Sequence, residues 1–163
     1  QEPTGWKRQY GALLEGGIHF VALISDIVGG PPCRVAAEFP GREAGEPERH
    51  SVTSLEYPDG SRAELRYSWN TPSLLKGVLQ HSYIHGTRGK ITFESNGIYV
   101  LVKGKGRHRV FGPSVKDMMG YQSMIQDFIA CLEDRSRTPY SDIARAIREL
   151  QIVFSAYEAG GMS

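Results

Sequence analysis

The spacing of the apolar residues changes twice along this chain, from helical to strand-like and back to helical. This order of segments limits the folds that the chain can form. Residues 14–28 repeat apolar side chains at helical spacing, and Gly29, Gly30, Pro31 and Pro32 then stop the helix. The middle of the chain alternates polar and apolar residues as strands do, and the last third returns to helical spacing. This order predicts an α+β domain of two layers, with helices on one face of a mostly antiparallel open sheet, rather than an alternating βαβ nucleotide fold.

The clearest strands form a hairpin, residues 51–57 and 61–69, joined by Pro58, Asp59 and Gly60. In the second strand, four apolar residues alternate with polar ones: Ala63, Leu65, Tyr67 and Trp69. Further strands are expected at 33–39, 78–84, 90–94, 98–103 and 107–111, with Asn96 and Gly97 as a two-residue turn. Residues 41–49, rich in Gly, Glu and Pro, are predicted to form an exposed loop.

Two amphipathic helices are expected in the last third. The first covers residues 121–132, and the second begins after Pro139 with Ser141 as its N-cap and ends at Gly160 and Gly161. The second helix is predicted to bury five residues at helical spacing: Ile143, Ile147, Leu150, Phe154 and Tyr157.

Composition and charge indicate an ordinary soluble globular domain. The 163 residues, 40% hydrophobic and 23% charged, suit one domain with a real hydrophobic core. A net charge of +1 argues against a dedicated nucleic-acid binder, and the longest apolar stretch, residues 18–28, is too short to span a membrane. Cys33 and Cys131 match no zinc or redox spacing, which favours reduced thiols in a cytoplasmic protein.

Glu15 and His19 form the strongest candidate for a catalytic pair in the sequence. Four residues apart, they can share one face of a helix, where a carboxylate orients an imidazole for proton transfer. A chance surface pair or a core histidine is the competing interpretation. Gly16 and Gly17, between them, are poor helix formers and indicate a helix start or a close backbone approach.

Other candidate sites have simpler structural interpretations. Residues 86–89 superficially resemble a phosphate loop, but a tight turn is favoured because no helix follows. The basic residues 103–109 could meet phosphate or form a solvated hairpin tip. His81 and His85 could form half a metal site, although no third ligand stands at a convincing distance, so no metal is expected.

Three residues before the first helix form a further candidate group. Trp6, Lys7 and Arg8 could reach the same cleft as His19 and bind substrate; the alternative is a packed tryptophan beside two solvated basic residues. The chain opens at Gln1 in an irregular stretch without a methionine, which indicates a piece of a longer protein.

These residues carry a family resemblance. Residues 6–20, with Gly-Ala-Leu-Leu-Glu-Gly-Gly-Ile-His at 11–19, resemble the start of the C-terminal domain of Gfo/Idh/MocA oxidoreductases. Residues 54–69 resemble its paired strands, residues 84–91 its Ile-x-Gly-Thr-x-Gly segment, and residues 128–157 its closing helices. The resemblance covers about residues 6–159 and implies the fold of the glyceraldehyde-3-phosphate dehydrogenase-like C-terminal domain.

The resemblance implies that this chain is one of the two domains of an enzyme. Family members place an N-terminal Rossmann domain, which binds NAD or NADP, before an α+β domain whose open sheet often forms the oligomer interface. The sequence contains no Gly-x-Gly-x-x-Gly motif after a strand, so residues 1–163 are expected to form only the second domain. By resemblance, His19 is the acid/base and Glu15 its helper, although the family usually has Asp where Glu15 stands.

The expected function is therefore substrate binding and oligomerisation within an NAD(P)-dependent oxidoreductase acting on a sugar, polyol or related hydroxy compound. The cofactor would be bound mainly by the absent domain, and the chain alone is expected to be inactive. The expected partners are a small-molecule substrate and further copies of the chain, without nucleic acid or membrane. Two alternatives stay open: a non-catalytic dimerisation or ligand-sensing module, and a cofactor-independent isomerase.

Overall fold

The computed structural model describes residues 9–70, 80–95, 97–113, 117 and 120–162, with the side chain of Arg107 left out. The chain forms two compact units. The first combines Gln1–Thr71 with Ser141–Ser163, and the second is Pro72–Tyr140. The expected α+β class with antiparallel strands is confirmed, and each unit has its own sheet.

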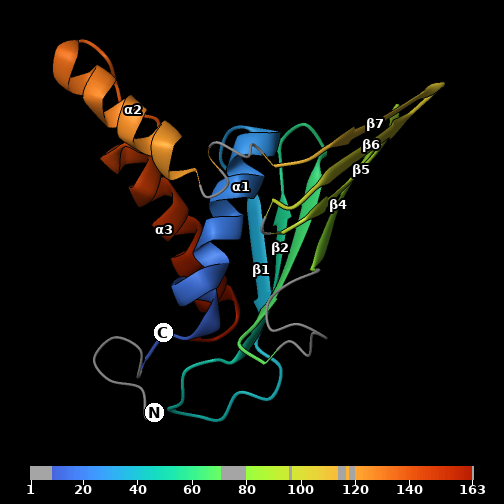
Figure 1. Ribbon diagram of the computed structural model, residues 1–163. Helices are drawn as coiled ribbons and strands as arrows, with labels where there is room; N and C mark the ends of the chain where they lie inside the picture. The colour runs from blue at the N-terminus through green and yellow to red at the C-terminus, as the bar shows by residue number, and fades with distance from the viewer. Residues whose placement is uncertain (1–8, 71–79, 96, 114–116, 118–119, 163) are drawn as a thin grey trace. The chain divides into compact units, whose positions relative to one another are not determined.

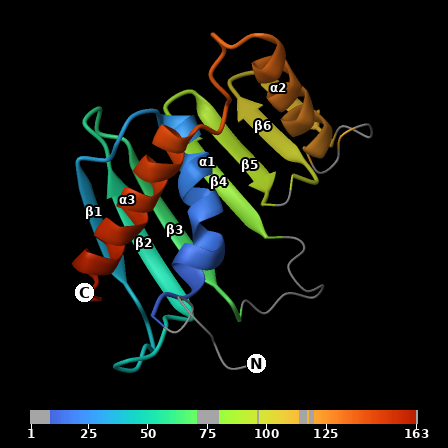
Figure 2. The ribbon, with the colours of Figure 1, turned by 90° about the vertical axis from the view of Figure 1, so that its left-hand side faces the viewer.

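The first unit packs helices on a three-stranded sheet. Its elements are η2 (Leu13–Gly17), α1 (Ile18–Val28), β1 (Arg34–Glu38), β2 (His50–Glu56), β3 (Arg62–Ser68) and α3 (Ile143–Ala159). The strands pair antiparallel in the order β1-β2-β3. Helix α3 packs on β1 and α1, while η2 and α1 contact β3, so the helices cover one sheet face (Figures 1 and 2).

The core of this unit lies between the sheet and the helices. Along β2 every second residue is buried, which places Leu55 toward the helices. Val21 of α1 and Val153 of α3 are fully buried against the same cluster. Burying one such side chain contributes about 1.5–3 kcal/mol, so this contact between layers is a main source of stability.

Helix α3 differs from its prediction in two ways. Of the five residues expected in the core only Tyr157 is buried, and Ile143 is 80% exposed. The helix carries two neighbouring apolar stripes, and the stripe that contains Ile152, Val153 and Ala156 enters the core. The N-cap is Asp142 rather than Ser141, because its carboxylate accepts the N–H of Arg145 at 2.6 Å.

In its described residues, the second unit holds a four-stranded antiparallel sheet and one helix. Its elements are β4 (His81–Gly86), β5 (Gly89–Glu94), β6 (Val100–Gly104), β7 (Arg107–Phe111) and α2 (Tyr121–Glu133), with the strand order β4-β5-β6-β7. The tight turn expected at residues 86–89 is confirmed, because β4 ends at Gly86 and β5 begins at Gly89. The first strand starts later than expected, and residues 78 and 79 lie outside the described residues.

Two further expectations concern the second unit. Asn96 lies outside the described residues, while Gly97 has the positive φ of 81° that suits a turn. Helix α2 shows the expected apolar stripe, yet Met124 is 61% exposed and Phe128 63%. Its start is held by Asp117, whose pKa is lowered by hydrogen bonds from Ser123. In the described part of the chain, every helix is too short or too polar to cross a membrane.

The start of the first helix is held by a buried glutamate that the sequence placed in an exposed loop. Glu48 is fully buried, and its two carboxylate oxygens accept the backbone N–H groups of Gly11 and Leu13, each at 2.8 Å. Its own carbonyl oxygen accepts the N–H of Ala12 at 2.9 Å. Residues 41–49 do form a loop, but the predicted exposure is wrong at Glu48. The first helical N–H groups need acceptors, and this buried side chain provides them.

Tyr157 completes this arrangement from the other end of the chain. Its phenol donates to Oε1 of Glu48 at 2.8 Å and accepts the N–H of Leu14 at 3.1 Å. Burial, and then the charge of Glu48, raise the pKa of Tyr157 far above its usual value, so the phenol remains a donor. Helix α3, the loop before β2 and the start of the first helix thus share one buried network.

Close packing fixes the next turn of the same helix. A Cβ at Gly16 would lie 2.0 Å from the hydroxyl oxygen of Tyr67 on β3, and one at Gly17 would lie 2.9 Å from the Leu13 side chain. The glycine pair therefore marks a close backbone approach, as the sequence indicated. The turn is also wider than an α-helix, because Leu13–Gly17 is a π-helix.

Replacing Glu48 by Gln should destabilise the protein. The amide cannot accept at both ends, so one buried N–H loses its partner, and we expect the free energy of unfolding to fall by about 1–3 kcal/mol. Urea unfolding measures this change. Glu46→Gln, in the exposed part of the same loop, is the matched control and should change stability by less than about 0.5 kcal/mol. Equal effects of the two substitutions would contradict the anchoring role.

Gly16→Ala should also destabilise the fold, because the added methyl group collides with Tyr67. Overpacking of this kind costs about 1–3 kcal/mol. Gly112→Ala is the control, since a Cβ there meets no atom within 4 Å. In a Tyr67→Ala background the cost of Gly16→Ala should shrink, and an unchanged cost in a double-mutant cycle would refute the collision as its cause.

Candidate functional site

Glu15 and His19 lie on the anchored helix, at its solvent side. Glu15 belongs to η2, His19 is the second residue of α1, and both side chains are exposed. Exposure of His19 contradicts the interpretation of a core histidine. At four residues apart on a helical segment, the two side chains project from the same side.

His19 has an imidazole that is open to a ligand. Within the residues that the structure describes, its ring makes no hydrogen bond, ion pair or ring contact. An exposed imidazole on a fixed helix can accept a proton from a bound substrate or donate one to it. The geometry therefore permits acid/base chemistry at His19, with the carboxylate of Glu15 one turn earlier.

The residues that fix this helix were missed in the sequence. Glu48 stands in a Gly- and Pro-rich loop, where nothing in the local pattern marks it as buried. Tyr67 and Tyr157 were assigned only to the core of a strand and a helix. Their hydroxyl groups contact the first helix from segments that are distant in sequence. The local spacing of apolar residues cannot predict such a contact.

The remaining predicted site residues are only partly accounted for. Trp6, Lys7 and Arg8 lie outside the described residues. Tyr10, just after them, packs its ring on Phe154 and Tyr157 at centroid distances of 5.2 and 4.9 Å. The chain is therefore fixed against α3 immediately before the first helix.

His81 and His85 share the exposed face of β4, as expected for residues four apart in a strand. His81 contacts the Tyr99 hydroxyl, and His85 packs 6.4 Å from the Tyr83 ring. Among the described residues, no group of three or more potential ligands could hold a metal ion. Cys33 and Cys131 are free thiols in this structure.

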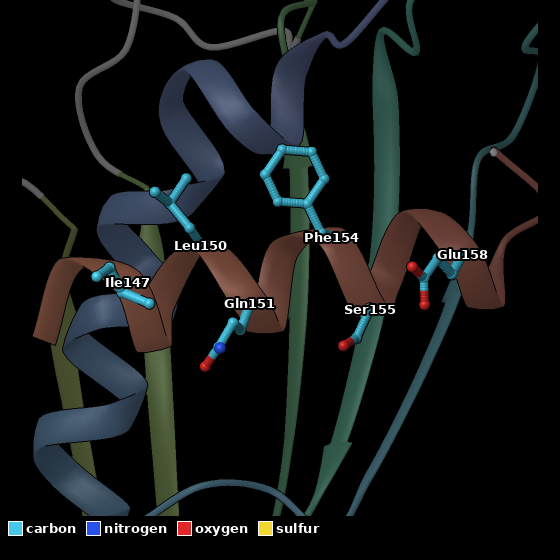
Figure 3. A pocket seen from close by; sticks show the side chains of 6 residues that line it. All are labelled: Ile147, Leu150, Gln151, Phe154, Ser155 and Glu158. Carbon is cyan, nitrogen blue, oxygen red and sulfur yellow. The ribbon is translucent and has the colours of Figure 1, made fainter. Parts of the chain in front are cut away.

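A groove of about 300 Å³ lies along the outer side of α3 (Figure 3). The described residues that line it all come from this helix: Ile147, Leu150, Gln151, Phe154, Ser155 and Glu158. Neither Glu15 nor His19 belongs to it. Three of its described lining residues, Gln151, Ser155 and Glu158, are polar, but the acid/base pair predicted from the sequence lies outside the groove.

Solved structures share this fold at low sequence identity. An oxidoreductase from Agrobacterium radiobacter, in complex with NAD+, L-tartaric acid and magnesium, matches with a TM-score of 0.78 and 16% identity over 95% of this chain and 49% of its own. UDP-N-acetylglucosamine 3-dehydrogenase from Acidithiobacillus ferrooxidans matches with a TM-score of 0.75 and 15% identity, over 91% of this chain and 46% of its own.

A third structure is the WlbA dehydrogenase from Bordetella pertussis in complex with NADH and UDP-GlcNAcA. Its TM-score is 0.66 and its identity 18%, over 93% of this chain and 44% of its own. The chain thus spans about half the length of these structures. Comparison with curated proteins by sequence gave no match.

The family itself is established by sequence. The family model described as the GFO/IDH/MocA C-terminal domain matches residues 2–92, which is more than half of the chain. The match includes the first helix with Glu15 and His19 and the first three strands. The chain belongs to the Gfo/Idh/MocA C-terminal domain family of oxidoreductases.

Proposed function

We propose that this chain is the substrate-binding and oligomerisation domain of an NAD(P)-dependent oxidoreductase that acts in the cytoplasm on a sugar, polyol or related hydroxy compound. The observation that carries the proposal is the exposed Glu15–His19 pair on a helix held by Glu48, in a member of this family. Two of the solved structures named above act on or bind nucleotide sugars, and one binds tartaric acid, which favours a hydroxylated substrate.

The chemistry assigned to this chain is a proton transfer. NAD or NADP, when bound, exchanges a hydride with the substrate carbon. His19 would remove the proton of the substrate hydroxyl during oxidation and return it during reduction, while Glu15 orients the imidazole or the substrate. Trp6, Lys7 and Arg8 precede the helix closely enough in sequence to bind the same substrate.

The cofactor does not fit this chain alone. The sequence has no glycine-rich turn between a strand and a helix, and the strands of both units are antiparallel rather than parallel. We therefore assign cofactor binding to a preceding domain of the full-length protein and expect residues 1–163 alone to lack dehydrogenase activity.

Oligomerisation is assigned to the sheet of the second unit. One face of this sheet carries apolar side chains in register, with Ile84 opposite Ile91, Ile91 opposite Val102, and Val100 opposite Phe111. Phe111, on the edge strand β7, is 48% exposed. A second copy packed on this face would cover apolar surface that is otherwise in contact with water.

A non-catalytic dimerisation or ligand-sensing module is the alternative, in which the Glu15–His19 pair is only a surface feature. The same apolar sheet face favours it, because that face requires no catalytic residue. Turnover by the full-length protein separates the two functions.

Substituting His19 by Ala in the full-length enzyme should lower kcat by about 10²–10⁴-fold, the usual contribution of a positioned acid/base. The KM for the dinucleotide should stay unchanged, since His19 is not assigned to cofactor binding. Steady-state kinetics with a panel of polyols and sugars measures both constants. Ile27→Ala, at an exposed position of the same helix, is the control. Near-normal turnover of the His19 variant would sink the assignment.

Phe111→Asp should weaken self-association, because it places a charge in the apolar face. Val110→Asp is the matched control. Val110 is 73% exposed, and because it precedes Phe111 in the same strand, it projects from the face opposite the apolar one. Sedimentation velocity should show a smaller species for Phe111→Asp than for Val110→Asp. The same species for both variants would argue against this interface.

A further inference from the structure

One feature of the β4–β7 sheet is used neither by the proposed catalysis nor by the proposed interface: a row of basic side chains across all four strands. The strand register sets His85 opposite Lys90, Lys90 opposite Lys103, and Lys103 opposite His108. Residues paired in this way project from the same face. The row lies on the face opposite the apolar one, because Ile91 and Val102 are the next residues along their strands.

Such a row works against the stability of the sheet. The Cβ atoms of residues directly opposite each other lie about 5 Å apart, and two like charges in such a pair are destabilising. The two lysines are basic side chains on the central strands β5 and β6. A sheet has no packing reason to place them together.

Within the described residues, no carboxylate neutralises the row. Neither Lys90 nor Lys103 forms an ion pair there. Among the described residues of this sheet, Glu94 is the sole acid; it is fully buried and lies four residues from Lys90 along β5, about 13 Å away. Among the described residues of this sheet, the lysines thus have no acidic partner in reach and can attract an anionic ligand.

The surroundings add positive charge and an aromatic ring. The two turns at the same end of the sheet carry Arg88 and Lys105, both exposed. The Lys90 ammonium lies 4.1 Å from the centroid of the Tyr83 ring, a cation–π contact that holds it in place. Tyr83 remains 55% exposed beside the row.

We propose that the Lys90–Lys103 row is a binding site for a small molecule that carries a diphosphate group. Two ammonium groups from adjacent strands can each bind one of two linked phosphates, since lysine binds phosphate as a point charge. The exposed Tyr83 ring offers a flat surface for the rest of the ligand. The site is independent of the acid/base assignment to His19.

Titration of the 163-residue chain with inorganic pyrophosphate, followed by calorimetry and by backbone amide shifts, tests this site. Binding should be saturable, should move the amides of β5 and β6 around the two lysines, and should weaken as salt is added. Orthophosphate should bind more weakly because it offers only one phosphate group. Equal affinities for the two anions, or no saturable binding, would overturn the proposal.

The double variant Lys90→Gln/Lys103→Gln should weaken pyrophosphate binding by about tenfold or more. The matched control is Arg34→Gln/Arg62→Gln, which removes the same charge from the other sheet, where both arginines contact Glu56. The control should bind pyrophosphate as tightly as the parent protein does. An equal loss of affinity in both variants would show that only the net charge matters, and would overturn the site.

A stability measurement guards against a folding artefact. The melting temperature of Lys103→Gln, which removes one charge of the pair and keeps the Lys90–Tyr83 contact, should equal or exceed that of the parent. A lower melting temperature would contradict the repulsion on which the proposal depends.

Discussion

The buried carboxylate of Glu48 is the contact on which the candidate site depends. It joins three segments that are distant in sequence: the loop before β2, the first helix, and α3 through Tyr157. A charged side chain is stable in the interior only when its oxygens are fully hydrogen-bonded, and here three donors surround them. The polarity of the helix start adds to this, since N–H groups there favour a negative charge.

The same network explains how a glycine-rich segment can hold the candidate pair in place. Gly11 and Gly16 are poor choices for a helix, yet each lies where a side chain would strike another part of the fold. A Cβ at Gly11 would lie 2.0 Å from the carbonyl oxygen of Glu48. The backbone of this segment is thus held by close contacts with Glu48 at Gly11 and with Tyr67 at Gly16. Glu15 and His19 extend from it to solvent.

Much of this fold could be predicted from periodicity, because its strands and helices each bury one face. The hairpin of β2 and β3 and the turn at residues 86–89 follow from alternation and turn residues alone. Periodicity failed where two stripes compete, as on α3, where the residues around Val153 were buried instead of Ile143. It also could not find Glu48, whose burial depends on partners in other segments. For the candidate site, spacing predicted the Glu15–His19 pair, whose role stays a prediction, but it did not indicate the residues that hold the helix of that pair.

The π-helix at Leu13–Gly17 has a consequence for how insertions and deletions would act on this protein. Such a turn holds one residue more than the α-helical turn it replaces. Losing Gly16 or Gly17 would rewind the segment to an ordinary α-helical turn and leave Glu15 and His19 three residues apart. At that spacing the two side chains still share one side of the helix. The wide turn can therefore give up one residue without separating the carboxylate from the imidazole, so the relative position of the two groups tolerates a change in chain length that their chemical identity does not.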